Sequence, residues 1–151
     1  MINWQCKYFT ELSTPELYKI LRLRIEVFAV QQNCVYQDCD DKDQDSLHLM
    51  GWKNGILVAY ARLLPPGLAF DAPSIGRVVT SPGNRRTGLG KELMQVAISK
   101  IKELYGDSDI TISAQVYLKN FYSSFNFQSV GESYIEDGID HIRMTRDKRD
   151  Y

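Results

Sequence analysis

The segment from Gly76 to Lys91 constrains the fold more than any other part of the chain. It passes from an apolar, strand-like stretch through a polar loop into glycines that open a helix. From Leu89 onward, apolar residues recur at helical spacing as far as Gly106, which predicts a long amphipathic helix. A strand that leads into such a helix is typical of a sheet with helical cover, so we expect an α/β protein.

Hairpin signals predict the antiparallel part of the sheet. Each is an Asn-Gly or Asp-Gly pair between apolar runs, a pattern that favours a tight turn. The pairs are Asn54-Gly55, between 47–53 and 56–64, and Asp137-Gly138, between 127–135 and 139–144. Other strands are expected at 4–9, 74–80 and 110–114, and helices at 15–31, 89–106 and 117–125, the first with Thr14 as N-cap and Pro15 as its first residue. The order β α β β β α β α β β implies a mixed, mostly antiparallel central sheet flanked by helices, in one domain spanning 1–151.

Composition narrows the classes of protein that remain. A chain of 151 residues is long enough to bury one substantial core, and its formal net charge of −1 provides no basic field for nucleic acid or an anionic membrane. No apolar run approaches the roughly 20 residues that a membrane helix needs, and the N-terminus has no signal-peptide pattern. Cys6, Cys34 and Cys39 form no C-x-x-C pair, which favours reduced thiols. We therefore expect a cytoplasmic protein.

The loop before the long helix has the chemistry of an anion site. The first backbone N–H groups of a helix are unsatisfied and carry positive partial charge. Gly88 and Gly90 lack a Cβ, so a pyrophosphate can approach the main chain closely. Arg85, Arg86 and Lys91 add formal charge. Taken alone, the segment also fits an ordinary loop whose basic side chains are solvated.

The order of residues in this loop excludes the better known phosphate-binding motifs. Gly83 and Gly88 have the spacing of a P-loop, but Leu89-Gly90 follows where Lys-Ser/Thr is required. The dinucleotide fingerprint fails because its last glycine is missing. A kinase glycine loop finds no catalytic-loop or magnesium motif downstream.

What remains, Arg-x-x-Gly-x-Gly from Arg85 to Gly90, resembles the coenzyme A pyrophosphate loop of the GCN5-related N-acetyltransferase (GNAT) superfamily. The resemblance implies acetyl-CoA as cosubstrate without a metal, and a preceding strand whose backbone binds the pantetheine arm. The residues it implies for acetyl-CoA binding are Val78, Val79, Thr80, Arg85, Arg86, Thr87, Gly88, Leu89, Gly90, Lys91 and Gln115.

A second element strengthens this resemblance. Residues 121–127 are similar to the superfamily's F-Y-x-x-x-G-F element, which implies that Tyr122 lies near the coenzyme sulfur and protonates the departing thiolate. A phenol with a pKa of about 10 suits that role, because its acidity is comparable to that of a thiol. Asn126 replaces the usual glycine and tolerates the left-handed conformation better than most residues. The alternative is that Tyr122 is a core aromatic of an amphipathic helix.

The resemblance narrows to the ElaA-like acetyltransferases. The matching segments are 21–38, 49–54, 75–78 and 136–142, which together with the loop span nearly the whole chain. Gln31 stands where that family often has glutamate, which weakens the case for a carboxylate base at this position. Val35 and Asp140 stand where proline is usual.

The resemblance implies an N-acetyltransferase that transfers acetyl to a primary amine by direct attack, with an N–H near Val79 stabilising the oxyanion. The amine must lose a proton, and the candidate bases by chemistry are Glu26, His48, Glu136 and His141. Small amines, amino acids, polyamines, and protein N-termini or lysines all remain open as acceptors. A non-catalytic acyl-CoA-binding or regulatory module of the same fold is the main alternative, and an acyltransferase for longer chains is another. Homodimers are common in the superfamily and stay open here.

Other charged segments receive simpler interpretations. Residues 41–46 begin like a calcium loop but lack its glycine, and Trp52 stands where the final glutamate belongs. We interpret 38–45 as a solvated acidic loop at the amine entrance. Cys34, Cys39 and His48 match no zinc-finger spacing. The basic C-terminal residues are expected to be solvated; they are Arg143, Arg146, Lys148 and Arg149.

Overall fold

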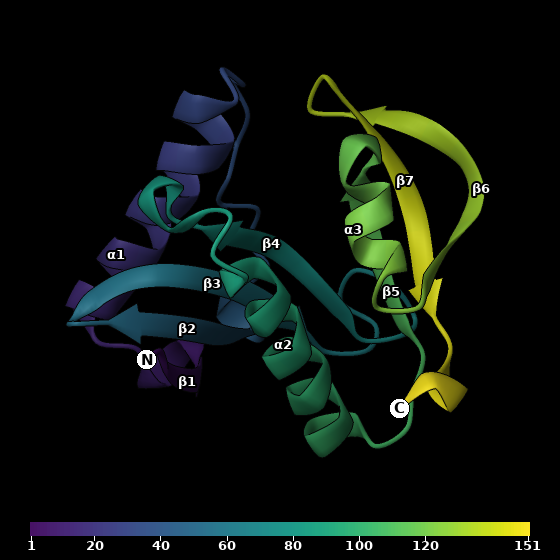
Figure 1. The fold of residues 1–151 in the computed structure, drawn as a ribbon, viewed down its shortest axis with the longest axis horizontal. Coiled ribbons are helices and arrows are strands. Elements are labelled where there is room, and N and C mark those ends of the chain that lie inside the picture. Colours follow the sequence, from purple (N-terminus) through teal and green to yellow (C-terminus); the bar gives the residue numbers. More distant parts are fainter.

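The computed structural model describes residues 1–151, and every predicted helix and strand is present in the predicted order (Figure 1). The strands are β1 (Asn3–Tyr8), β2 (Leu47–Lys53), β3 (Ile56–Leu64), β4 (Ser74–Thr80), β5 (Ile110–Gln115), β6 (Phe127–Glu136) and β7 (Ile139–Arg146). The α-helices are α1 (Thr14–Arg24), α2 (Leu89–Tyr105) and α3 (Lys119–Ser123), and a π-helix, η2 (Ile25–Gln31), continues α1. None of the helices has the length and apolar character needed to cross a membrane.

The strands form two antiparallel sheets, of order β1-β2-β3-β4 and β5-β7-β6. Strands β4 and β5, which α2 connects, are the facing edges of these sheets. They begin side by side, where the N–H of Thr111 donates to the carbonyl of Pro73 at 3.1 Å, and they are not paired beyond that point. The predicted mixed α/β fold is confirmed, and its central sheet is split by a cleft between β4 and β5.

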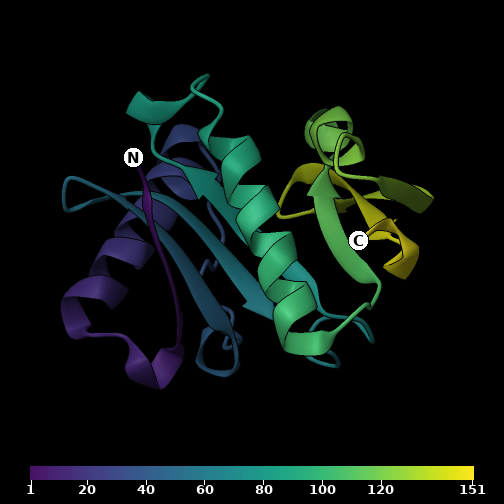
Figure 2. The same ribbon diagram turned by 60° about the horizontal axis from the view of Figure 1, so that its bottom comes forward.

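Helices α1 and α2 cover opposite faces of the first sheet (Figure 2). The alternation of β3 shows this directly, since Ala59 and Ala61 join the core under α2 while Tyr60 joins the cluster under α1. The larger cluster continues from α2 to β5 and β7, so that the two sheets share one core despite the cleft.

The N-terminal helix differs in detail from the prediction. Ser13, not Thr14, is the N-cap: its Oγ accepts from the N–H of Glu16 at 3.1 Å, and Glu16 accepts the N–H of Ser13 at 2.8 Å. This reciprocal pair is a capping box, which fixes the helix start one residue earlier than expected.

Beyond Arg24 the helix widens into the π-helix, where the N–H of Gln32 donates to the carbonyl of Val27 at 3.1 Å. The wider turn rotates the helix surface, so that Val27 is buried and Ile25 is 45% exposed, against the pattern of a regular helix. The same rotation brings Phe28 and Gln32 to the cleft.

The acidic loop at 38–45 is only partly solvated, contrary to expectation, although Asp41 and Asp45 are exposed. Asp38 and Asp43 are only 7% and 6% exposed. Three arginines from α1, β3 and β4 bind three aspartates of the loop: Arg24 pairs with Asp38 and Asp43, Arg62 with Asp40 and Asp43, and Arg77 with Asp38 and Asp40. The sequence could not reveal this cluster, because its cations come from three separate elements. We call these six residues the arginine–aspartate network.

Candidate active site

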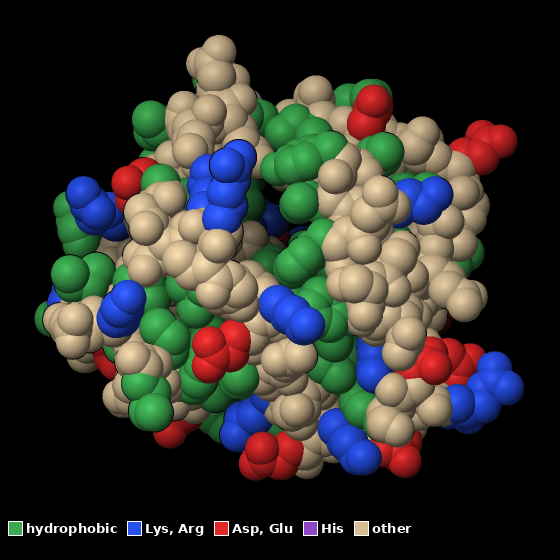
Figure 3. All heavy atoms as spheres, in the orientation of Figure 1, with side chains coloured by type: hydrophobic (Ala, Val, Ile, Leu, Met, Phe, Trp, Pro, Cys, Tyr) green, Lys and Arg blue, Asp and Glu red, His purple; other side chains and the backbone are tan.

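Two cavities meet in the cleft between the sheets, and Figure 3 shows the molecule hollowed near its centre. The loop cavity, about 730 Å³, lies among η2, the end of β4, the loop before α2, and α3. The sheet cavity, about 500 Å³, lies between β4 and the inner face of the β5-β7-β6 sheet. The residues that line both are Phe28, Gln32, Val78, Gln115, Leu118 and Tyr122.

The loop cavity contains nearly all of the predicted acetyl-CoA residues. All of them line it except Thr87, whose Oγ1 donates to the carbonyl of Asn84 at 2.6 Å, and Leu89, whose side chain is buried in the core. Its lining includes Arg85, Arg86 and Lys91 but no aspartate or glutamate. A cavity whose charged groups are all positive, at the start of a helix, suits phosphate groups.

The backbone at the start of α2 is shaped for close approach of an anion. Gly88, the N-cap, has φ +82°, and Arg86 has φ +62°, so both are left-handed. Backbone amides of alternating hand form concavities that bind anions. A Cβ built on Gly88 would meet nothing within 4 Å, so the space beside it is open.

Strand β4 presents an open edge to the cleft. Its register with β3 shifts between Tyr60 and Arg62, where a β-bulge includes Arg77 at φ +51°. Ser81 donates its N–H to the carbonyl of Val58 at 2.8 Å, so the alternation of the ladder turns the N–H and carbonyl of Thr80 toward the cleft. An extended ligand can therefore pair with β4 as an additional strand. Nothing in the sequence indicated the bulge.

Tyr122 lies where the two cavities meet. Helix α3 buries its ring, 8% exposed, in edge contacts with Phe121 and Phe127. Burial, with a smaller contribution from Tyr117, raises the pKa of the Tyr122 hydroxyl well above its usual range. The phenol is therefore protonated at physiological pH. Asn126 is left-handed at φ +70°, which confirms that asparagine accommodates the turn in place of glycine.

Gln32, which follows η2, and Gln115 of β5 bridge the cleft where the two cavities meet. The amide of Gln32 donates to Oε1 of Gln115 at 3.2 Å, and Gln115 donates back at 3.4 Å. Gln31 accepts a hydrogen bond from Arg85, so an uncharged amide at position 31 connects η2 to the loop before α2.

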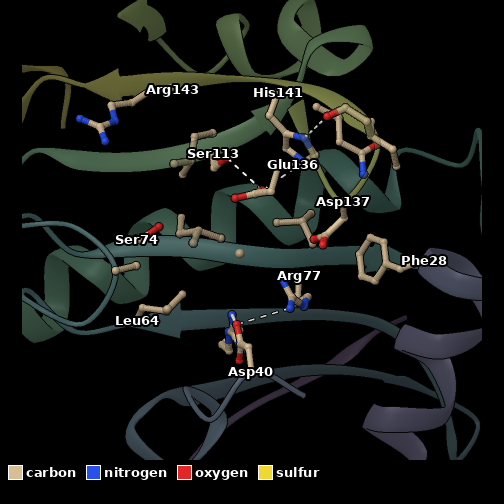
Figure 4. Close-up of a pocket in the computed structure, with 18 of the residues that line it drawn as sticks. Phe28, Asp40, Leu64, Ser74, Arg77, Ser113, Glu136, Asp137, His141 and Arg143 are labelled. Atoms are coloured by element: carbon tan, nitrogen blue, oxygen red, sulfur yellow. Dashed lines mark hydrogen bonds and ion pairs between the residues drawn. The ribbon is translucent and has the colours of Figure 1, made fainter. Parts of the chain in front are cut away.

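The sheet cavity has a wall of polar side chains (Figure 4). His141 donates through Nδ1 to the carbonyl of Ile139 at 2.8 Å, and its Nε2 lies 3.5 Å from Glu136. Because a carbonyl can only accept, Nδ1 carries a proton. Ser113 also donates to Glu136 at 3.3 Å.

The four candidate bases occupy different environments. Glu136 and His141 line the sheet cavity, whereas Glu26 and His48 line neither cavity. His48 is fully buried, with Nδ1 2.7 Å from the hydroxyl of Tyr60 and Nε2 2.8 Å from the carbonyl of Asp43. Glu26 lies on η2, 3.8 Å from Arg22. The structure therefore brings only the Glu136–His141 pair to the cleft.

Sequence reasoning missed several residues of the sheet cavity. Arg143 is exposed, as expected for the basic tail, but it also lines this cavity; Arg146 of the same tail is buried, contrary to expectation, and donates to the carbonyl of Phe125 at 3.0 Å. The alternation of Ile139, His141 and Arg143 along β7 was the available signal, because every second strand residue faces the same side. Asp137 and Phe28 had no comparable signal.

Comparisons with known proteins agree with this geometry. A family model described as an acetyltransferase (GNAT) domain matches residues 15–148. The protein ElaA of Escherichia coli is 44% identical over 149 residues, 97% of each chain. The crystal structure of an acyl-CoA N-acyltransferase from Pseudomonas aeruginosa is 43% identical with a TM-score of 0.92, covering 97% of this chain and 99% of that chain. The crystal structure of Escherichia coli ElaA is 44% identical with a TM-score of 0.91, covering 97% and 100%.

The similarity extends over nearly the full length of the chain and includes both walls of the cleft. The chain therefore belongs to the GNAT acetyltransferases, and within them to the ElaA-like family.

Proposed function

We propose that this acyl-CoA-dependent N-acyltransferase transfers an acetyl group from acetyl-CoA to a primary amine by direct attack. The observation that carries the proposal is the meeting of two cavities of different chemistry at Tyr122 and Gln115. A cationic cavity suited to phosphates and a polar cavity suited to an amine meet at one phenol, which supports transfer between the two substrates.

The loop cavity binds acetyl-CoA. Arg85, Arg86 and Lys91 neutralise the phosphates, and the first N–H groups of α2 donate to them. The open edge of β4 holds the pantetheine arm, and the N–H of Thr80, next to Val79, is available to an oxyanion.

Tyr122 donates a proton to the departing thiolate. Its raised pKa keeps the phenol protonated before the reaction, and donation becomes favourable when the thiolate is as poorly solvated as the phenol.

Glu136, with His141 beside it, accepts the proton of the amine, directly or through one water. Glu26 and His48 have no part in this scheme. We propose the cytoplasm as the compartment, since Cys6, Cys34 and Cys39 are all free thiols.

Calorimetric titration with acetyl-CoA tests the cosubstrate. Micromolar-range binding by the wild type should be lost in an Arg85→Ala/Gly88→Glu double variant, because one change removes a cation and the other places a carboxylate at the helix start. Titration with butanoyl-CoA tests the preference for acetyl. A well-folded wild type that binds neither thioester would overturn the proposal.

Release of free thiol with a panel of amines tests catalysis. Turnover that falls in Tyr122→Phe supports the transferase. Acetyl-CoA binding without turnover on any amine would instead favour the non-catalytic acyl-CoA-binding module.

A further inference from the structure

The charges of the sheet cavity indicate what kind of amine it binds. Resting on the proposed transferase, we infer that the acceptor is a small amino acid-like amine with a carboxylate, whose carboxylate binds Arg143 and whose amino group lies beside Glu136 and Asp137. The three side chains line one cavity, from the cleft junction to its far end (Figure 4).

The wall formed by the first sheet and the loop at 38–45 carries one cation more than its ion pairs account for. Arg62, Arg77 and Asp40 line the cavity as members of the arginine–aspartate network, in which three cations meet three anions, and Lys42 of the loop lines it outside that network. A balanced, mutually hydrogen-bonded cluster has little net attraction for a charged ligand. Apart from Lys42, selectivity for charge must therefore come from the second sheet.

The second sheet separates its charges along the strand direction. Register places Gln115 opposite His141, and Ser113 opposite Arg143, one row further along β5. Two residues of a strand span about 7 Å. Because Gln115 lines both cavities, Arg143 lies about one row beyond the reaction point.

The acidic groups lie nearer to that point. Asp137 lies on the side of Phe28, another residue common to both cavities, and the Glu136 carboxylate lies 3.5 Å from His141 in the first row. An ammonium group is stabilised there before it loses its proton.

The guanidinium group of Arg143 is oriented by an aromatic ring and is available to bind an anion. Its guanidinium lies over the ring of Phe70, 5.0 Å from the centroid, and no carboxylate of the protein pairs with it. Stacking on an aromatic face fixes the guanidinium plane and leaves its N–H edge free for bidentate binding of a carboxylate.

This arrangement disfavours polyamines. A second ammonium of a polyamine would lie near the Arg143 cation, and such like-charge contacts discriminate against a ligand. An uncharged alkyl amine would leave the guanidinium without a partner. A carboxylate satisfies both ends of the cavity.

The test measures acetyl transfer to matched amines: 4-aminobutanoate, 4-aminobutanamide and butylamine, together with amino acids from glycine to 6-aminohexanoate. The acids should have kcat/KM about 10- to 100-fold above their uncharged analogues. Arg143→Gln should remove that preference by raising KM with little change in kcat, and Arg143→Lys should restore part of it. The exposed Arg149, outside the cavity, supplies the matched control Arg149→Gln.

The results separate this inference from the proposed function. If acetyl-CoA does not bind, the proposed function fails. If acetyl-CoA binds and uncharged amines react as well as acids, or if no acid of the panel reacts, the inference alone is wrong. Retention of the acid preference in Arg143→Gln, with acetyl-CoA binding intact, would also overturn it.

Discussion

The two cavities of the cleft differ in how the chain builds them. The loop cavity takes its charged groups from one continuous segment, 85–91, and all of them are positive. The sheet cavity draws on the loop at 38–45, on β3, β4, β5 and the β6–β7 hairpin, and carries charges of both signs. Under the proposed function, binding of the phosphate-bearing cosubstrate thus depends on local sequence, whereas acceptor binding depends on strand register and long-range packing.

This contrast has a physical reason. A helix start supplies its own N–H groups, so a short segment with glycines and basic residues is sufficient to bind phosphate. A site for a small amine needs several polar groups at fixed distances, and only a folded sheet places them. The proposed acceptor site therefore depends on several distant segments of the fold, and the proposed phosphate site on one.

Removing the Tyr122 hydroxyl should have the largest effect on activity, because Tyr122 lines both cavities. We expect Tyr122→Phe to lower kcat by about 10²- to 10⁴-fold, as for loss of a general acid. The ring stays packed, so acetyl-CoA affinity should change little. Steady-state kinetics and calorimetry measure the two quantities.

Tyr105→Phe is the matched control, since Tyr105 ends α2 and lines neither cavity. A wild-type kcat in Tyr122→Phe would exclude the phenol as the acid, and an equal loss in both variants would point to a general effect on folding.

Breaking the arginine–aspartate network tests how much these long-range ion pairs beside the sheet cavity stabilise the fold. Asp43 accepts from Arg24 at 2.8 Å and from Arg62 at 2.9 Å, and both guanidinium groups are almost fully buried. Asp43→Asn leaves these cations partly unpaired, so we expect a loss of about 3 kcal/mol in the free energy of unfolding. Urea titration measures it.

The exposed Asp45 of the same loop gives the control Asp45→Asn, which should cost far less. Equal effects of the two substitutions would mean that the network does not stabilise the fold.

The fold followed from the sequence because its signals are local. Asn54-Gly55 and Asp137-Gly138 turn the predicted hairpins with left-handed residues, as I′-type turns require. Elements defined by hydrophobic period and by turn residues are determined within a few positions of the chain, and their order then implies the fold class.

What the sequence did not show depends on contacts between distant segments. Asp38 is buried because Arg24 of α1 and Arg77 of β4 pair with it; the π-helix begins directly after Arg24, and the bulge of β4 includes Arg77. The place of Arg143 at the cavity was missed for a similar reason, because Phe70, over which it lies, is far from it in the chain.

Glu136→Gln tests whether the two cavities act independently, because Glu136 lines only the sheet cavity. Glu136 is half-exposed beside His141, so water can partly replace it as a proton acceptor. We expect kcat/KM for the amine to fall about 10- to 100-fold near neutral pH, with no change in acetyl-CoA affinity. The control is Glu132→Gln, an exposed residue of β6 outside both cavities. A parallel loss of acetyl-CoA binding would mean that the two cavities are not independent.

The smallest expected effect is the pH dependence of stability that comes from His48, a buried residue beside Asp43 of the arginine–aspartate network. Burial lowers the pKa of His48 below its ordinary value of 6.5. The unfolded chain therefore binds the proton first as the pH falls. The stability that neutral His48 preserves is complete above pH 6.5 and is lost as the pH falls through its pKa in the folded protein.

The free energy of unfolding should therefore decline between pH 7 and pH 5, and His48→Gln should flatten this slope. Arginines lower the pKa values of Asp40 and Asp43, so the losses from these carboxylates begin only below their ordinary value of 3.8 and do not overlap this range. Urea titrations across the range measure the slope. A slope unchanged in His48→Gln would show that a group other than His48 takes up the proton.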